Sequence, residues 1–292
     1  MRRTWSILTL LCLILVVIPL RAHPGSAIAV DAKGRVFFVD TGAGVFRIEA
    51  PGRLTRVGGP AFHWMALDGE GRFAKATLPT GRGWEMVASG PDPTLVLSSD
   101  FPVALSEGAI FTPRPGSDGR IRIHRTEPGG RESIRVTLPF RAERDRWLGG
   151  IAAGPDGSLY FTEGNSVRRV ARDGGITTIT EGVKLEGCLK PPGYEPDSGR
   201  DLRGLAVAAD GTAYVAASGC GALLRVNPRG ETTVLLRSER PWSPTAVALF
   251  GGDVYVLEYT HSPGDDRRQW LPRVRKIGRG GEVSVLAVVE KR

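Results

Sequence analysis

The sequence predicts an all-β protein with the architecture of a six-bladed β-propeller, with four antiparallel strands in each blade. Three observations lead to this prediction. A strand-turn-strand pattern recurs along the chain, no stretch after the N-terminal segment has a helical period, and glycine and proline supply 39 and 21 of the 292 residues. This glycine and proline content suits many tight turns. The hydrophobic and charged fractions, 41% and 24%, are those of a globular protein.

The N-terminal segment has the pattern of a targeting signal. Arg2 and Arg3 precede an apolar run of 16 residues from Trp5 to Leu20, and Ala22 follows at a suitable cleavage position. A basic start, a short apolar run and a small residue are typical of a secretory signal peptide, and the run is shorter than the ~20 residues of a comfortable membrane span. We therefore predict a signal peptide over residues 1–22 and a single propeller domain over residues 23–292. An uncleaved N-terminal anchor is the alternative; both place the domain outside the cytoplasm, periplasmic or secreted, with no further membrane span.

The charge of the chain excludes one class of partner. Without residues 1–22 the chain has 36 Lys and Arg against 31 Asp and Glu. The basic residues are mostly arginine and are spread along the sequence, with no basic block and no interleaving of basic and aromatic residues. Nucleic-acid grooves need such patterns, so we expect no nucleic-acid partner.

The repeat unit consists of an apolar strand, a Gly-containing turn and a second strand that ends in an acidic or small residue. A third strand alternates basic and apolar residues, and a fourth follows another Gly turn. The 270 residues after the N-terminal segment divide into six copies of ~45, the size of a four-stranded blade. The clearest copies begin at residues 28, 151, 205 and 247. The predicted blades cover residues 25–60, 61–100, 101–140, 146–200, 202–240 and 242–290.

These blades resemble NHL repeats and the six-bladed propellers of the gluconolactonase/regucalcin-like superfamily. The resemblance covers the whole chain after the N-terminal segment, and its motifs concern the fold more than the function. In the hydrolytic relatives it implies a divalent metal on the axis, held by Glu, two Asn and Asp. Here only Asn165 and Asn227 are available after residue 22, and Asn227 lies in a turn at the opposite end of its blade. The lactonase site is therefore not transferred to this chain.

The long connections all fall at one end of the predicted ring. With the strands of a blade named A to D from the axis outward, the A–B and C–D turns at one end are short. The long segments are B–C loops or D–A connections at the other end: residues 78–83, 139–147, 181–203 and 259–272. Loops presented by a rigid scaffold often carry function. We therefore expect any site at the B–C/D–A end.

Two of the three cysteines lie at this same end. Cys12 belongs to the N-terminal segment, whereas Cys188 is in the long connection into blade five and Cys220 is in the B–C loop of that blade. An even pair in an oxidising compartment predicts a disulfide. It would close a loop of about 33 residues and stabilise the fold by roughly 3–4 kcal/mol. Two unpaired thiols are the alternative.

Charged side chains at strand ends near the axis are the candidate ligand-binding residues. The B strands end with Asp40, Glu163 and Glu258 in blades one, four and six, and with Ala76 and Ala217 in blades two and five. The three acids are the candidates for calcium or another divalent cation, which prefers oxygen ligands. The other candidates are strand A starts and one loop residue: His63, Asp100, Arg203 and His261.

Structural roles for these residues remain open. Arg203 would form an ion pair with Glu163 or Glu258, and His63 would pack beside Trp64 rather than act as a base beside a metal-bound water. The long loops are flanked by tryptophans that would form an aromatic rim or pack between blades: Trp84, Trp147, Trp242 and Trp270.

Two functions follow from these features. The first is an exported ligand-binding or protein-interaction module, whose B–C/D–A end contacts a small molecule, glycan, peptide or protein. The alternative is a divalent-metal-dependent hydrolase of the lactonase or esterase type with a non-standard ligand set. The sequence leaves open whether the protein is an enzyme.

Overall fold

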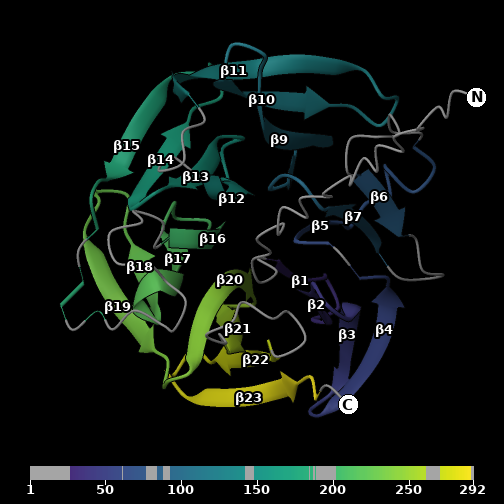
Figure 1. The fold of residues 1–292 in the computed structure, drawn as a ribbon, viewed down its shortest axis with the longest axis vertical. Helices are drawn as coiled ribbons and strands as arrows, with labels where there is room; N and C mark the ends of the chain where they lie inside the picture. The colour runs from purple at the N-terminus through teal and green to yellow at the C-terminus, as the bar shows by residue number, and fades with distance from the viewer. Residues whose placement is uncertain are drawn as a thin grey trace, which may run out of the picture.

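The computed structural model describes residues 27–290 except 61, 77–83, 88–92, 142–147, 184, 187, 189–201 and 261–269. In this part of the chain 23 strands form six sheets, and the one helix is the three-residue 3₁₀ turn η1 (Ser218–Cys220). Figure 1 shows the sheets arranged as the blades of a ring, with β1, β5, β12, β16 and β20 on the inner side and β4, β15, β19 and β23 on the outer side. The predicted six-bladed architecture is confirmed.

Five of the blades contain four antiparallel strands in chain order. Blade one contains β1 (Ile28–Val30), β2 (Val36–Asp40), β3 (Gly44–Ala50) and β4 (Arg53–Gly58). Blade three contains β8 (Ala104–Ser106), β9 (Ala109–Pro115), β10 (Arg120–Thr126) and β11 (Glu132–Arg141). Blade four contains β12 (Leu148–Ala153), β13 (Leu159–Glu163), β14 (Ser166–Val170) and β15 (Ile176–Thr180).

The last two blades follow the same plan and complete the ring. Blade five contains β16 (Leu202–Val207), β17 (Ala213–Ala217), β18 (Ala222–Val226) and β19 (Thr232–Arg237). Blade six contains β20 (Trp242–Phe250), β21 (Asp253–Thr260), β22 (Pro272–Ile277) and β23 (Val283–Val288). Each of these sheets is built from consecutive strands, so blade six meets blade one through side-chain packing and single hydrogen bonds and not through a shared strand.

Blade two departs from the repeat. Its described strands are β5 (Trp64–Asp68), β6 (Trp84–Val87) and β7 (Thr94–Ser98), in the order β5-β7-β6. The strand beside β5 therefore ends at Ser98, and the prediction that it ends at Ala76 is wrong. The Asp68 carboxylate accepts a hydrogen bond from the Phe73 amide at 2.7 Å. This bond and the burial of Phe73 stabilise turns in the segment after β5. In the other blades the second strand stands at this place in the sequence.

The hydrophobic core is divided among the six junctions between blades. Successive side chains of a strand point to opposite faces of the sheet, so each inner strand contributes to two junctions. On blade two, Met65 and Leu97 pack against blade one, whereas Trp64 and Val96 pack against blade three. One cluster joins blades six and one, and there the Tyr259 hydroxyl donates a hydrogen bond to the Val39 carbonyl oxygen. Every junction of the ring, including its closure, therefore has its own apolar cluster.

The axial strands of blades four to six are packed unusually closely. A Cβ atom on Gly150 would lie 2.9 Å from the Cα of Gly204, and one on Gly204 would lie 2.8 Å from the carbonyl oxygen of Thr245. These neighbours are backbone atoms, which cannot move aside as a flexible side chain could. Glycine therefore allows β12, β16 and β20 to approach one another at the axis.

Short regular turns close the A–B/C–D end of the ring. Their backbone hydrogen bonds run from the Gly34 amide to Asp31, from Gly230 to Asn227 and from Gly281 to Gly278. Of the long connections predicted at the other end, residues 78–83 lie wholly outside the described residues and the others lie partly outside them. Among the residues described, no helix has the length and apolar character needed to cross a membrane.

Candidate functional site

A disulfide joins the long connection into blade five to the short B–C turn of the same blade. Cys188 and Cys220 are bonded, with their Cα atoms 4.6 Å apart and a sequence separation of 32. The predicted pairing is confirmed. Such bonds form and persist in oxidising compartments, so the bond favours an oxidising environment.

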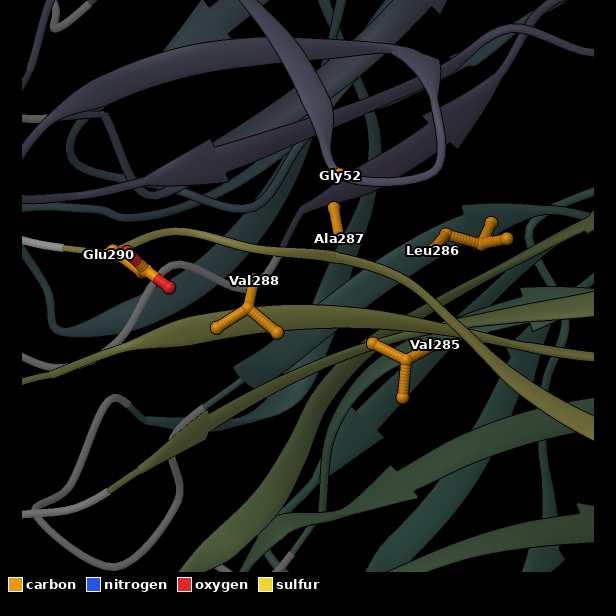
Figure 2. Close-up of a pocket in the computed structure, with 6 residues that line it drawn as sticks. All are labelled: Gly52, Val285, Leu286, Ala287, Val288 and Glu290. Carbon is orange, nitrogen blue, oxygen red and sulfur yellow. The ribbon is translucent and has the colours of Figure 1, made fainter.

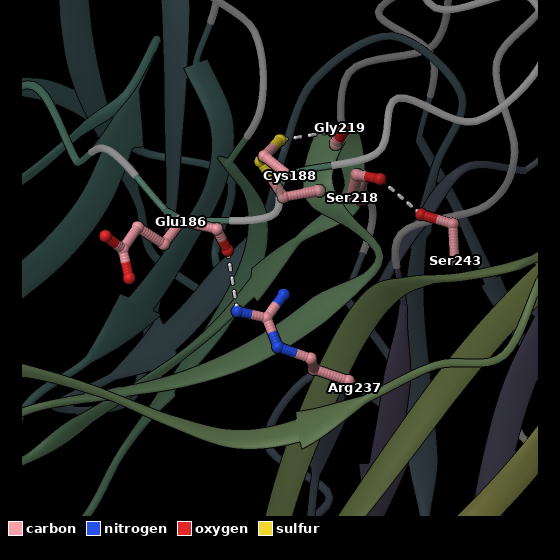
Figure 3. The surroundings of a disulfide bond; sticks show 7 residues. Glu186, Cys188, Ser218, Gly219, Arg237 and Ser243 are labelled. Carbon is pink, nitrogen blue, oxygen red and sulfur yellow. Dashed lines mark hydrogen bonds between the residues drawn. A yellow bond between two sulfur atoms is a disulfide. The ribbon is translucent and has the colours of Figure 1, made fainter.

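Further hydrogen bonds hold the same region together and connect it to blade six. The Arg237 guanidinium donates to the carbonyl oxygen of Glu186 at 2.8 Å, next to the disulfide (Figure 3). The Ser243 hydroxyl of β20 donates to the carbonyl oxygen of Ser218, and the Ser218 hydroxyl donates to that of Pro244. Blades five and six are therefore joined by buried hydrogen bonds at the end where the long connections leave.

The three predicted acids are all buried but lie at three different junctions. Each shares a face of its strand with the residue two positions earlier. Phe38 packs between blades six and one, Phe161 between three and four, and Val256 between five and six. Asp40, Glu163 and Glu258 occupy equivalent positions in their blades, as predicted, but they face the preceding blade and do not converge at the axis.

Two of these acids have local structural partners. Asp40 accepts a hydrogen bond from the Gly42 amide at 2.9 Å, which closes the turn after β2. Glu163 pairs with Arg168 of β14, with Nε and Oε2 2.5 Å apart. The prediction of an ion pair at Glu163 is therefore correct in kind, but the arginine that forms it comes from the neighbouring strand and is not Arg203.

Glu258 is the centre of a larger buried ion network. Its Oε2 lies 2.5 Å from Nε of Arg273, and its Oε1 lies 2.5 Å from Nη2 of Arg275. The Glu258 side chain is fully buried and both arginines are nearly so. The Ser238 hydroxyl, from the connection between blades five and six, also donates to Oε1. One carboxylate thus serves two arginines of β22, and again neither of them is Arg203.

The outer edge of this network reaches solvent at Glu239. Its Oε1 lies 2.7 Å from Nη1 of Arg273, and its side chain is 69% exposed. The hydrogen bond from Arg273 and the charge of that arginine lower the pKa of Glu239 below its ordinary value. The Arg273 guanidinium also lies over the indole of Trp242, with 4.2 Å between Cζ and the ring centroid, a cation–π contact. We call Ser238, Glu239, Trp242, Glu258, Arg273 and Arg275 the arginine cluster.

The remaining candidates lie apart from this cluster. His63 Nδ1 is hydrogen-bonded to the carbonyl oxygen of Ser99 at 2.8 Å, and its ring lies beside that of Trp64. Asp100 is exposed and follows β7; strand A of blade three, predicted to begin at approximately Asp100, begins at Ala104. The carbonyl oxygen of Arg203 accepts a hydrogen bond from Thr162. His261 lies outside the described residues.

The predicted metal ligands are not brought together. Asp40, Glu163 and Glu258 belong to separate junctions, and two arginines already surround the carboxylate of Glu258. Within the described ranges there is no group of three or more His, Cys, Asp or Glu side chains that could hold a metal ion.

Two surface grooves lie elsewhere on the ring. One, of about 560 Å³, follows β23 beside the turn of blade one that contains Gly52; Figure 2 shows Ala287 pointing toward that turn and Val285 and Val288 pointing away from it. The other, of about 200 Å³, lies between the A–B ends of blades two and three and includes Asp68, Arg72 and Glu107. Neither contains any of the predicted site residues.

Sequence reasoning identified Glu258 and Trp242 but missed the arginines. The sequence Arg273-Val274-Arg275 indicates that these two arginines lie on one face of a strand, because residues two apart on a strand share a face. Their distance from Glu258 along the chain concealed the pairing, which depends on the register of β21 against β22.

No family model matches the chain, and no curated protein matches its sequence. Among solved structures, a streptogramin B lyase matches with a TM-score of 0.53 and 15% identity, covering 92% of this chain and 85% of that one. A calcium-binding regucalcin from Agrobacterium tumefaciens matches with a TM-score of 0.49 and 19% identity over 80% of this chain and 81% of that one. Virginiamycin B lyase from Staphylococcus aureus matches with a TM-score of 0.47 and 16% identity, covering 92% and 85% of the two chains. The likeness to the streptogramin B lyase concerns the fold alone, and this chain is a β-propeller of that general type.

Proposed function

We propose that the protein is an exported ligand-binding or interaction module that uses the B–C/D–A end of blades five and six. The observation that carries this proposal is the fixing of that end by the Cys188–Cys220 disulfide, beside a buried cluster of charges. A disulfide that ties a long connection to its blade reduces the freedom of the loop before binding. Affinity improves when a binding surface is already ordered, because less conformational entropy is lost on association.

The alternative of a metal-dependent hydrolase gains no support from the described residues, because the acids proposed as its ligands face different junctions. Burial of charge between blades five and six is more informative. Charged side chains are rarely buried unless they are paired, and perturbed charge groups gather at functional sites. We therefore place the binding surface at the arginine cluster and at the exposed residues around it.

Two valines at opposite ends of β23 provide a matched test. Val288 is paired in register with Arg273 at the B–C/D–A end, whereas Val283 is paired with Ile277 at the turn end; they are 41% and 46% exposed. Neutral and charged small molecules, glycans and peptides are screened by the rise in melting temperature that a ligand of the native state produces. Binders are then titrated against Val288→Ser and Val283→Ser by calorimetry.

The proposal expects that Val288→Ser weakens binding while Val283→Ser leaves it unchanged. The reverse pattern would overturn the proposal. So would ligands whose affinity is unchanged by Val288→Ser, Val283→Ser and Trp242→Ala, because the binding surface would then lie elsewhere.

A further inference from the structure

We infer that the arginine cluster binds a carboxylate attached to an apolar body, and that Glu239 occupies this position when no ligand is bound. The inference rests on the proposed function and specifies its ligand class. The site would be formed by the guanidinium groups of Arg273 and Arg275, the indole of Trp242 and the exposed valines of β23.

The first step is the charge balance between blades five and six. Arg273 and Arg275 carry two positive charges at burial of more than nine-tenths, and Glu258 provides the one fully buried carboxylate that pairs with them. A buried charge without a partner is strongly unfavourable. One positive charge therefore requires a second anion, and in this structure Glu239 provides it.

The second step is that Glu239 is suited to be displaced. Its side chain is 69% exposed, whereas that of Arg273 is 7% exposed. It lies in the connection between β19 and β20 and is held by a single arginine. Water can solvate the exposed Glu239 carboxylate when this side chain turns away, which limits that part of the cost. The buried Arg273 is then left with an unpaired charge at Nη1. The carboxylate of a ligand would restore the pairing by taking the place of Glu239.

The third step is the unused hydrogen-bonding capacity of the arginines. Within the described residues, Nη2 of Arg273 and Nε of Arg275 are buried and have no hydrogen-bond partner. Buried donors in folded proteins are nearly always satisfied, so these two donors have hydrogen-bonding capacity that the described residues do not use. The planar guanidinium fork matches the two oxygens of a carboxylate.

The fourth step is the apolar surroundings. Val288 and Val285 are the register partners of Arg273 and Arg275 across β22 and β23, and both are substantially exposed. Directly opposed residues project from the same face of a sheet. A ligand whose carboxylate reached the arginines would therefore place its remaining atoms near the valines and the edge of Trp242. This arrangement favours an aromatic or aliphatic carboxylate over a small hydrated anion.

The test compares benzoate with its neutral analogue benzamide and with inorganic phosphate, on wild type and Glu239→Gln. If Glu239 leaves the site open about one-tenth of the time, its removal should tighten apparent benzoate binding about tenfold. Benzamide should bind neither protein measurably, and phosphate should bind more weakly than benzoate. Glu49→Gln is the matched control, because Glu49 also pairs with an arginine but on blade one, and it should bind as wild type does.

Two further variants in the Glu239→Gln background separate the contributions. Arg273→Lys retains the charge but not the fork and should lose the tenfold gain. Val288→Ser should weaken benzoate binding and leave acetate binding unchanged. This second test remains informative even if the Arg273→Lys protein does not fold. Unchanged or weaker benzoate binding in Glu239→Gln, equal binding of benzamide, or equal binding of phosphate would overturn the inference. A neutral ligand that is still lost on Val288→Ser would then leave the proposed binding surface standing and refute the ligand class alone.

Discussion

Blade two and the pair formed by blades five and six show two ways in which one repeat has diverged. Blade two has three described strands in the order β5-β7-β6, and its buried Asp68 holds a turn in place. Blades five and six keep four strands each and add a disulfide and a buried charge cluster. Blade two keeps the inner strands that pack on both neighbouring blades, which is enough to close the ring. The disulfide and the buried ion pairs of blades five and six are not needed for that packing, which is why we place the function there.

The largest expected effect comes from breaking the charge cluster. Glu258→Ala leaves two buried arginines without their shared carboxylate and should lower the free energy of unfolding by about 3–5 kcal/mol. The corresponding change on blade two, Asp68→Ala, removes one hydrogen bond from a backbone amide and should cost about 1–3 kcal/mol. Urea denaturation of both variants measures the difference. Equal losses would show that the cluster adds no more than a local turn does.

The disulfide should rank next. The double variant Cys188→Ala/Cys220→Ala opens a loop of 32 residues in sequence separation and should lose roughly 3–4 kcal/mol of stability. Intact-mass measurement of the exported protein with and without reductant checks the bond itself. Two alkylatable thiols in the non-reduced exported protein would contradict its role outside the cytoplasm.

Axial packing gives a smaller effect. Gly204→Ala places a methyl group 2.8 Å from the Thr245 carbonyl oxygen and should cost about 1–3 kcal/mol. Gly59, in the connection into blade two, is the contrasting position, because a Cβ atom added there would have no neighbour within 4 Å. Gly59→Ala should therefore change stability by less than about 1 kcal/mol. Thermal melts of the two variants compare the regions; similar shifts would argue against close packing of β16 on β20.

The smallest effect concerns pH. Arg273 lowers the pKa of Glu239 below its usual 4.5, so the ion pair stabilises the folded protein above pH 4.5 and loses this effect as the pH falls through the lowered value. The melting temperature of wild type should exceed that of Glu239→Gln at pH 7, and the two should converge in acid. Because Glu239 is exposed, high salt should also reduce the difference. A difference that grows toward low pH would be inconsistent with this pairing.

Regular repeats explain how much of the fold could be predicted. The Gly-containing turns and alternating strands of blades one, four, five and six predict strand ends at Asp40 and Glu163, as the structure has them. The end predicted at Glu258 is wrong by two residues, because β21 continues to Thr260. Blade two lacks these signals after Asp68, so the position of β7 beside β5 could not be found from local pattern.

The site was predicted less completely, for a physical reason. Only Cys188 and Cys220 follow residue 22, so the sequence allows one disulfide pair there, and the structure contains it. The partner of a buried acid must be chosen from many arginines and depends on strand register and on which face of the blade each side chain occupies. Arg203 was the nearest candidate by repeat position, whereas register selected Arg273 and Arg275 for Glu258.

Amide hydrogen exchange with and without benzoate tests the central claim, that blades five and six carry the binding surface and blade two does not. In the Glu239→Gln protein, benzoate should slow exchange in β20, β22 and the connection after β19, because binding to the native state adds to the cost of opening. Strands β5 and β7 should be unaffected. Protection centred on blade two or on the A–B/C–D turns, or no change at saturating benzoate, would contradict the account.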